Sequence, residues 1–339
     1  MKNNIESRKR LILTVIAILL SVCLLFLAYR IFGLMDNYFG KLNAVSDDEY
    51  GYRHGGQAEY MIDGKWYVQK EKIETYLLIG IDKYESAIKV DNGYRNNQQS
   101  DALFLLVIDR ENYSYSIIHI NRDTMANIRM FDINGIPYNT FEGQLALSHT
   151  YGSGLEDSCE NTVWSVSDYM FGLDIHHYAS FSMDAVPVMN DKIGGVTLTV
   201  MDDMTVIDEA LIKGNTVTLT GDQALSYVRA RGELENSTNI ERMKRQRQFV
   251  TAFLEQARTA IAADPSVSTE MMKSINEYIV SDLSANELMS LTNVLNNYVF
   301  TGINAIEGEA RKGEQFMEFY TDEDALKELV LDTFYDLKK

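Results

Sequence analysis

An uncharged apolar run near the N-terminus constrains this chain more than any other feature. No charged residue occurs from Leu11 to Tyr29, and at about 1.5 Å per helical residue this run can cross a hydrocarbon core roughly 30 Å thick. Arg8, Lys9 and Arg10 directly precede the run, and positive charge on that side keeps an N-terminus in the cytoplasm. We therefore expect a single-pass membrane protein whose later residues lie outside the membrane.

A cleaved signal peptide is the alternative interpretation of this run. The run is longer than a usual signal-peptide core and no A-x-A-like site follows it, so the sequence favours an uncleaved anchor. We expect a cytoplasmic tail over residues 1–10, a transmembrane anchor over 11–32, and a polar spacer over 33–70 with a short hairpin around MIDGKWYV. Residues 71–339 are then expected to form one domain.

Charge and cysteine content limit what the exported part can do. The chain has a formal net charge of -18, and its first residues are basic, so the exterior is more acidic still. Such a domain repels a nucleic-acid backbone, and DNA lies on the other side of the membrane. Cys23 lies in the apolar run and Cys159 is alone outside it. Without an intrachain disulfide, stability must come from a hydrophobic core.

The pattern from Thr75 onward indicates a mixed α/β domain. Apolar or alternating runs predict strands at YLLIGI, ALFLLVI, YSYSIIHI, HHYASFSM and VTLTV. Helical spacing predicts helices over residues 158–171, 239–262, 267–281, 284–298 and 322–336. Gly194 and Gly195 are interpreted as a turn before VTLTV.

Polar residues are predicted to meet at one end of these strands. If residues 102–120 form an antiparallel hairpin, Asp101 and Arg122 are almost equidistant from its turn and face each other at the open end. Asp82 follows YLLIGI and reaches the same end if that strand is antiparallel to ALFLLVI. Carboxylate oxygens suit Mg²⁺ or Mn²⁺, and a guanidinium group suits a phosphate oxygen.

A second group of candidates lies in TGDQALSYVRARGELENSTNIERMKRQRQ. Thr220 and Gln223 fit a capping box, which predicts a short helix before an extended VRAR, where Arg229 and Arg231 point the same way. Asn239 is expected to cap the next helix. This places three further candidates on one face of its first two turns: Arg242, Arg245 and Gln246. An arginine so early in a helix is unfavourable unless an anion lies beside it, and a pyrophosphate would supply that anion.

Plainer interpretations exist for each of these residues. Arginines in an acidic protein are often solvated or paired with surface carboxylates. Asp123 is better interpreted as orienting Arg122 or capping a turn than as a catalyst. His119, His176 and His177 have no partner at metal-ligand spacing, so core or surface roles are favoured. The sequence contains no G-x-S-x-G, Walker loop or H-E-x-x-H. Part of the apolar hairpin core is a candidate slot for a lipid tail.

These residues resemble the LytR-CpsA-Psr family of bacterial cell-envelope phosphotransferases. The resemblance rests on seven motifs in order from Leu77 to Gln248, namely LLIGID, QSDALFLLVID, INRDTM, LSHTYGSG, NDKIGGVTLTV, LTGDQALSYVRAR and NIERMKRQRQ. It implies a three-layer α/β/α domain with a central mixed sheet, preceded by one transmembrane helix. It also implies a catalytic domain outside the cell membrane of a Gram-positive-type envelope.

The same resemblance implies an activity and a set of roles. Family members move a glycopolymer, such as teichoic acid or capsule, from a polyprenyl-pyrophosphate carrier onto peptidoglycan, with Mg²⁺ as the usual cation. Carried over, Asp82 and Asp101 hold the metal, and Asp101, Arg122 and Asp82 are the catalytic candidates. The implied pyrophosphate-binding residues are Arg122, Arg229, Arg231, Arg242, Arg245 and Gln246. The chain departs from the family pattern at Tyr84, Gln99 and Asn239, where many members have arginine, arginine and aspartate.

Two other functions remain open at this point. The same pocket would serve a pyrophosphatase that releases the lipid to water, whereas transfer needs an open groove for a glycan beside Arg122. The third hypothesis is a non-catalytic lipid or glycan sensor that regulates envelope genes, a transcriptional attenuator. The tail before the anchor is too short for a helix-turn-helix domain, so direct DNA binding is not expected.

Overall fold

The computed structural model describes residues 51–338 except 55–56, 63, 83–90, 92, 232–233 and 235–237. The predicted tail, the anchor over 11–32, most of the spacer and Tyr84 therefore lie outside the described residues. Within the described ranges, no helix is both long and apolar enough to cross a bilayer. The chain divides into two compact units, Met1–Tyr67 and Val68–Lys339.

The described part of the first unit is a small antiparallel sheet. β1 (Gly51–His54) pairs with β2 (Gln57–Ile62), and β2 neighbours β3 (Lys65–Gln69), which ends just past the unit boundary. Gly64 connects β2 to β3 with a φ of 74°, a conformation that side chains rarely adopt. The hairpin predicted around MIDGKWYV is thus confirmed.

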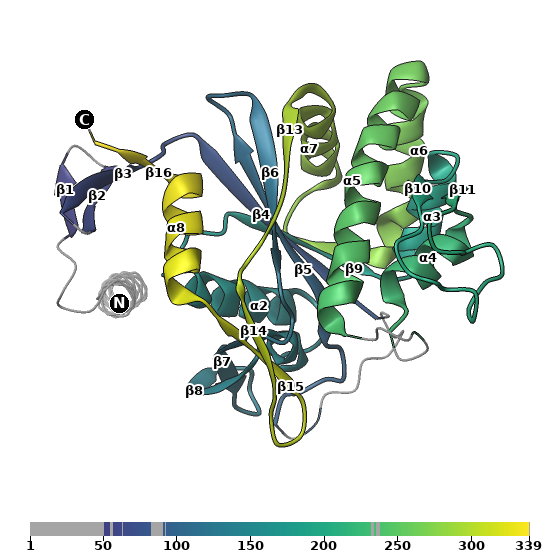
Figure 1. The fold of residues 1–339 in the computed structure, drawn as a ribbon. Coiled ribbons are helices and arrows are strands. Elements are labelled where there is room, and N and C mark those ends of the chain that lie inside the picture. Colours follow the sequence, from purple (N-terminus) through teal and green to yellow (C-terminus); the bar gives the residue numbers. More distant parts are fainter. Residues whose placement is uncertain are drawn as a thin grey trace, which may run out of the picture. The chain divides into compact units, whose positions relative to one another are not determined.

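A mixed sheet forms the centre of the second unit (Figure 1). Its described strands lie in the order β12, β9, β4, β5, β6, β13. β4 and β6 are antiparallel to β5, whereas β9 is parallel to β4 and β13 is parallel to β6. The strands are β4 (Ile73–Ile81), β5 (Ser100–Asp109), β6 (Ser114–Ile120), β9 (His177–Ser182), β12 (Ile279–Ser281) and β13 (Val299–Ala305). The mixed α/β class and the predicted antiparallel hairpin are confirmed.

Helices cover both faces of this sheet, because successive residues of its strands point to opposite sides. Leu77 and Ile79 of β4 are fully buried against α2 (Glu156–Tyr169) and α8 (Glu323–Phe334). Tyr76 and Leu78 face α5 (Asn239–Ala263) and α7 (Ala285–Asn297). Figure 1 shows α2 and α8 on one side of the strands and α5 and α7 on the other. The described residues therefore form three layers, α/β/α.

Smaller elements surround this core. Beside α5, a second hydrophobic cluster joins the β10–β11 ribbon to α4. On the α2 side, β7 pairs with β8. The remaining elements are β7 (Met125–Phe131), β8 (Pro137–Gln144), the 3₁₀ helix η1 (Leu145–Thr150), α3 (Ala185–Lys192), β10 (Thr197–Thr199), β11 (Thr216–Thr218), α4 (Gly221–Arg229), α6 (Ser266–Ile275), η2 (Asn276–Tyr278), β14 (Gly308–Lys312), β15 (Met317–Thr321) and β16 (Tyr335–Leu337).

One predicted helix end is wrong. The helix expected over 267–281 ends at Ile275, and its last residues form the edge strand β12. β12 pairs with β9, and Asp282 accepts a hydrogen bond from the backbone N–H of Tyr178 at 2.9 Å. The sheet therefore decides the conformation of this segment against its local helical pattern.

Candidate functional site

Three strand ends bring the predicted carboxylates and arginine to one edge of the sheet. β4 ends at Ile81, which pairs with Ser100 at the start of β5, and Leu103 of β5 pairs with Ile120 at the end of β6. Asp82 directly follows Ile81, Asp101 directly follows Ser100 within β5, and Arg122 lies two residues after Ile120. The structure thus confirms the predicted grouping at the open end of the hairpin.

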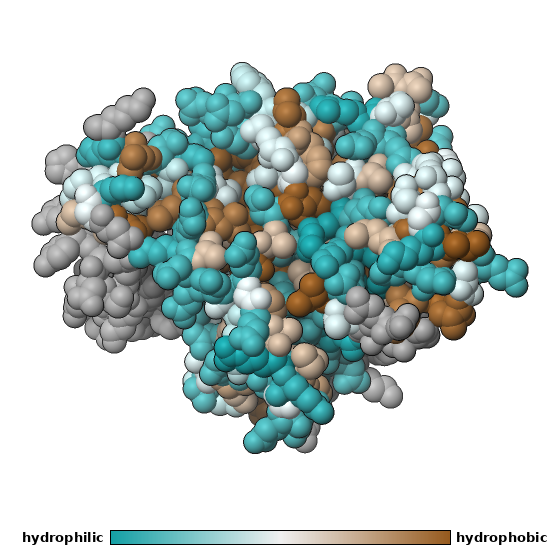
Figure 2. Space-filling model, in the orientation of Figure 1, coloured by the Kyte–Doolittle hydropathy of each residue, from teal (hydrophilic) through white to brown (hydrophobic). Residues whose placement is uncertain are grey.

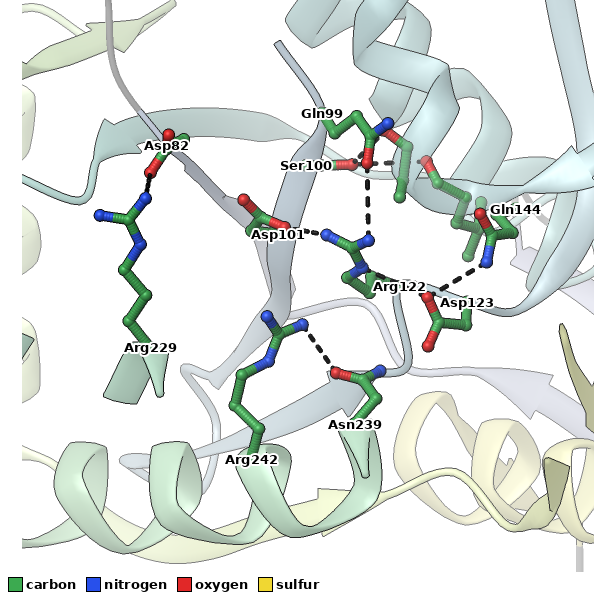
Figure 3. Close-up of polar contacts among 12 residues, drawn as sticks. Asp82, Gln99, Ser100, Asp101, Arg122, Asp123, Gln144, Arg229, Asn239 and Arg242 are labelled. Carbon is green, nitrogen blue, oxygen red and sulfur yellow. Dashed lines mark hydrogen bonds and ion pairs between the residues drawn. The ribbon is translucent and has the colours of Figure 1, made fainter. Parts of the chain in front are cut away.

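Arg122 is held between two carboxylates (Figure 3). Its Nη1 pairs with Asp101 Oδ1, and its Nε pairs with Asp123 Oδ1 at 3.2 Å. The side chains of Arg122 and Asp101 are only 15% and 23% exposed. Gln99 Oε1 accepts a weak hydrogen bond from Nη2 at 3.5 Å. The guanidinium is therefore fixed in orientation, while its outer edge lines a cleft.

Asp123 has the geometry of a positioning residue. Its side chain is 7% exposed and accepts a hydrogen bond from Gln144 Nε2 at 3.2 Å. Gln144 also donates to the carbonyl oxygen of Met317 at 2.6 Å, and Phe319 N–H donates to the Asp123 carbonyl at 2.8 Å. The C-terminal strand β15 thus supports Arg122 through Asp123, which agrees with the interpretation that Asp123 orients Arg122.

Asp82 lies at the outer edge of this group. It pairs with Arg229 Nη2 at 2.6 Å, and both side chains are more than half exposed, at 56% and 55%. A pair so open to water contributes roughly 0.2–1 kcal/mol, so either residue is free to exchange its partner for a ligand. Arg231 is exposed, lines the cleft, and makes no ion pair with any residue that the structure describes.

The local structure around these arginines differs in part from the prediction. Thr220 and Gln223 do form the predicted capping box at the start of α4. However, α4 continues to Arg229, so the predicted extended VRAR is wrong at Val228 and Arg229. Arg229 ends the helix and Arg231 follows it, yet both still reach the same cleft.

The first turns of α5 supply buried cationic and amide groups. Thr238, not Asn239 as predicted, caps this helix, and its side chain accepts from Glu241 N–H. Asn239 instead bridges Arg242 and Asn121, with both hydrogen bonds at 2.7 Å. Because Asn239 is neutral, its hydrogen bond does not neutralise the positive charge of Arg242.

Arg242 and Gln246 present unsatisfied atoms close to the cleft. Arg242 is 7% exposed and Gln246 is 4% exposed, yet Arg242 Nε and Gln246 Oε1 have no hydrogen-bond partner among the described residues. Burial, together with the nearby charges of Arg122 and Arg231, lowers the pKa of Arg242 to about 10. A crowded, desolvated cation of this kind is stabilised when an anion binds beside it.

Arg245 does not belong to this group, which corrects the prediction. It is 1% exposed, and it donates to the carbonyl oxygens of Tyr227 and Ala230 and pairs with Asp202 at 2.6 Å. These contacts occupy its guanidinium on the side of α5 that packs against α4. Arg245 therefore stabilises the fold and does not line the cleft.

The cleft itself has a volume of about 720 Å³ and a mainly polar, cationic lining. Asp101 is the one carboxylate among its described lining residues, against four arginines: Arg122, Arg229, Arg231 and Arg242. In Figure 3, Arg242 extends from α5 towards the space beside Asp101 and Arg122. This composition suits a ligand with several negatively charged oxygens.

An apolar cavity of about 300 Å³ adjoins the cleft. It lies between the sheet and helices α3, α5, α6 and α7, and its lining is almost entirely aliphatic and aromatic. Met183, Val228 and Gln246 line both the cleft and the cavity. The sequence predicted apolar strands here, but it gave no signal that helix residues such as Leu288 and Leu291 complete the lining of this cavity.

The segment leading to Asp101 is supported by η1. His149 Nδ1 donates to the carbonyl oxygen of Gln98 at 3.0 Å, and Ser100 Oγ donates to the carbonyl oxygen of Leu145 at 3.3 Å. His149 is fully buried, with Cys159 Sγ at 3.7 Å from its Nε2. Burial lowers the pKa of His149 to about 4, from an ordinary value of 6.5.

Acidification should therefore destabilise the folded protein through the buried His149. Because the folded pKa lies below the unfolded one, the stability from neutral His149 is complete above pH 6.5 and is lost as the pH falls towards 4. The expected loss is about 3 kcal/mol by pH 4, of which about 2 kcal/mol is lost by pH 5. Urea unfolding at pH 7.5 and pH 5 should show a smaller decrease in unfolding free energy for His149→Gln than for wild type. Equal decreases in the two proteins would contradict this explanation.

Known proteins with similar sequences were found for most of the chain. The LytR_cpsA_psr family matches residues 39–330. The polyisoprenyl-teichoic acid–peptidoglycan teichoic acid transferase TagU of Bacillus mycoides (strain KBAB4) is 25% identical over 264 residues, which cover 77% of this chain and 77% of the relative. The cell wall biosynthesis protein LcpA of Corynebacterium glutamicum is 24% identical over 246 residues, covering 66% of this chain and 46% of the relative.

Solved structures share the fold. TagT bound to LI-WTA is 19% identical with a TM-score of 0.58, over 78% of this chain and 90% of that one. The crystal structure of B. subtilis TagV is 20% identical with a TM-score of 0.58, over 77% of this chain and 95% of that one. The mixed sheet with its helical layers is therefore common to these proteins.

Proposed function

The chain belongs to the LytR-CpsA-Psr family, and from this premise we propose that it transfers a glycopolymer from a polyprenyl-pyrophosphate carrier to peptidoglycan in cell-wall assembly. TagU of Bacillus mycoides is named as a transferase of teichoic acid from a polyisoprenyl carrier to peptidoglycan. The reaction joins an acceptor hydroxyl to the phosphorus that carries the polymer and releases polyprenyl phosphate.

One observation carries this proposal: the cationic cleft adjoins an apolar cavity, and both are lined by Met183, Val228 and Gln246. Arg122 and Arg242 lie on the polar side, Leu78 and Leu254 on the apolar side, and Gln246 at the junction. A polyprenyl pyrophosphate has the same division, with a doubly charged head joined to a hydrocarbon tail. Burying such a tail is favourable by about 0.8 kcal/mol per methylene group.

The arginines would act by neutralising charge on the pyrophosphate. Phosphoryl transfer needs little covalent help from a protein, so positioning and electrostatic stabilisation supply most of the catalysis. Arg122 is fixed by Asp101 and Asp123, whereas Arg229 and Arg231 are exposed and can move to the ligand. We assign Arg122 to the transferring phosphoryl group and Arg242 with Gln246 to the phosphate nearer the lipid.

A divalent cation fits this site only together with the substrate. No group of three His, Cys, Asp or Glu side chains placed to hold a metal exists in the described ranges. Mg²⁺, however, is usually held by one or two carboxylates, with phosphate oxygens and water completing its coordination. We propose that Asp101 and Asp82 hold Mg²⁺ or Mn²⁺ beside the pyrophosphate. The ion would neutralise charge on the phosphate oxygens.

The proposal includes a location. A lipid-linked substrate requires the cleft to lie close to a membrane surface, and the uncharged run from Leu11 to Tyr29 would provide a single-pass anchor. Because basic residues precede that run, the N-terminus would lie in the cytoplasm and the catalytic domain would lie outside the cell membrane.

The test is transfer of a labelled polyprenyl-pyrophosphoryl saccharide to peptidoglycan by the full chain in detergent, with Mg²⁺ or EDTA. We expect metal-dependent transfer, and Asp101→Asn should lower its rate at least about a hundredfold because Arg122 and the metal lose a charged partner. Release of the saccharide phosphate to water alone would indicate a pyrophosphatase. Tight lipid binding without either reaction, unaffected by Asp101→Asn, would indicate a sensor.

A further inference from the structure

A second cleft lies on the other flank of α5. It has a volume of about 590 Å³ and is bounded by the first turns of α5, the turn between β13 and β14, and the strand β15. In Figure 1 the start of α5 lies next to β14 and β15, and the same region of Figure 2 mixes hydrophilic and hydrophobic residues. We call it the β15 cleft; its lining includes Asn121, Ile240, Met243, Arg247, Glu307 and Tyr320.

Different residues of α5 line the cationic cleft and the β15 cleft. Arg242 and Gln246 line the cationic cleft, and Met243 and Arg247 line the β15 cleft. Each pair is separated by four residues, so each lies on one helix face, and the two faces are adjacent. Asn121 lines the β15 cleft and the next residue, Arg122, lines the cationic cleft. The two clefts are therefore neighbours across one thin wall.

The end of this wall at the start of α5 is exposed. The wall consists of the start of α5 and the hydrogen bond from Asn239 Nδ2 to Asn121 Oδ1, at 2.7 Å. Thr238 is exposed and Ile240 is 36% exposed, so the N-terminal end of α5 is open to solvent. A polymer lying across this end can occupy the β15 cleft and still present a group at Arg122.

Arg247 is the residue that points to a ligand in the β15 cleft. Its side chain is partly buried, and desolvation lowers the pKa of its guanidinium even though Glu241 acts in the opposite direction. None of the described residues gives it a hydrogen bond or an ion pair. A partly desolvated cation without a partner binds a carboxylate favourably, and arginine does so with two parallel hydrogen bonds.

The other lining residues limit what that ligand can be. The carboxylates of Glu307, Glu309 and Asp322 surround the cleft, so a nucleic-acid backbone would be repelled. Arg311 pairs with Glu309 at 2.9 Å and lies 4.9 Å above the ring centre of Tyr320. Charges of both signs beside aromatic and hydroxyl side chains suit a glycopeptide that carries both carboxylate and amino groups.

We propose that the β15 cleft seats the acceptor peptidoglycan, with a stem-peptide carboxylate on Arg247. This rests on the proposed function and names its second substrate site. The glycan hydroxyl reaches the phosphoryl group at Arg122, and its oxygen forms a new bond to the phosphorus that carries the polymer. The bond from that phosphorus to the bridging oxygen breaks, polyprenyl phosphate leaves with the electron pair, and the hydroxyl proton passes to solvent.

The test compares Arg247→Gln with Lys244→Gln in the full chain. Lys244 lies one turn earlier on α5, is exposed and paired with Glu241, and lines neither cleft, so it controls for the loss of one positive charge. The probe is a disaccharide-pentapeptide with free stem carboxylates and its amidated form. We expect wild type and Lys244→Gln to bind the free-acid form about tenfold more tightly, and Arg247→Gln to lose this preference, since one charge-assisted pair is worth about a factor of ten.

A second variant and a kinetic measurement separate the possible outcomes. Ile240→Trp should fill the cleft from its exposed edge and raise the KM for the acceptor about tenfold, while the KM for the lipid-linked donor stays within about twofold. Wild-type binding of the probe without any transfer reaction would refute the proposed function and leave the binding site standing. Unchanged binding and acceptor KM in both variants, with transfer intact, would overturn the β15 cleft alone.

Discussion

Replacement of Arg122 by alanine should lower the kcat of transfer about a thousandfold, the largest effect expected for any single side chain here. Among the arginines that the structure describes in the cleft, Arg122 is the one that carboxylates fix on two sides, through Asp101 and Asp123. Preorganised charge stabilises a transition state without reorganisation during the reaction. Arg122→Lys keeps the charge but loses the forked geometry, so it should recover only a small part of the rate.

Arg110 provides the matched control for this experiment. It forms a two-bonded pair with Glu74, at 2.7 and 2.6 Å, and lies at the opposite end of β5. Arg110→Ala should therefore change stability without changing transfer. Because Arg122→Ala also leaves the buried Asp123 without its charged partner, thermal unfolding should be measured in parallel. A folded Arg122→Ala protein with near-wild-type kcat would contradict the assigned role.

Contacts that are close in sequence were predictable, because a hairpin leaves little choice of partner. The apolar runs on either side of Arg110–Asn112 fixed the pairing of β5 with β6, and this pairing brings Asp101 to Arg122. The capping box at Thr220 was also predictable, since both of its hydrogen bonds form within four residues. These features depend on turn and cap chemistry, not on the rest of the fold.

Features that depend on distant segments were not predictable from one sequence. Arg242 and Arg245 both lie in the early turns of α5, but contacts with Asp202, Tyr227 and Ala230 decide that Arg245 is structural. Likewise, Asp123 depends on Gln144, and Gln144 depends on the carbonyl oxygen of Met317, far along the chain. Helical spacing places side chains on a face, but only tertiary packing shows what that face meets.

The departures from the family pattern acquire a physical meaning from these contacts. Gln99 stands where the family resemblance implies an arginine. Its side chain is uncharged and accepts a hydrogen bond from Arg122. Asn239, where an aspartate is common, contacts Arg242 without neutralising it. Together with Tyr84, the three departures replace two cations and one anion of the pattern that the resemblance implies, so their summed charge becomes less positive by one. The cleft stays cationic because four arginines still line it against the single described carboxylate of Asp101.

Filling the apolar cavity should weaken donor binding in a way that depends on the length of the lipid. Leu291 of α7 lines the cavity on the side away from the cleft, whereas Met183 and Val228 lie at the junction with it. Leu291→Trp should displace the far end of a long polyprenyl tail and leave the pyrophosphate in place. Losing about four buried methylene groups costs about 3 kcal/mol, so the KM for a long-chain donor should rise roughly a hundredfold.

The chain length of the donor supplies the control. A donor with a short prenyl tail never reaches Leu291, so its KM should be nearly equal in wild type and Leu291→Trp, whatever small change in packing the substitution causes. The measurement is transfer by both proteins with a short and a long prenyl donor carrying the same saccharide. If Leu291→Trp raised both KM values equally, the cavity would not be the tail site and the tryptophan would act through a general loss of structure. A selective effect on the long donor would place the hydrocarbon between the sheet and α7, which is where the reaction gains the binding energy that holds the pyrophosphate against Arg122.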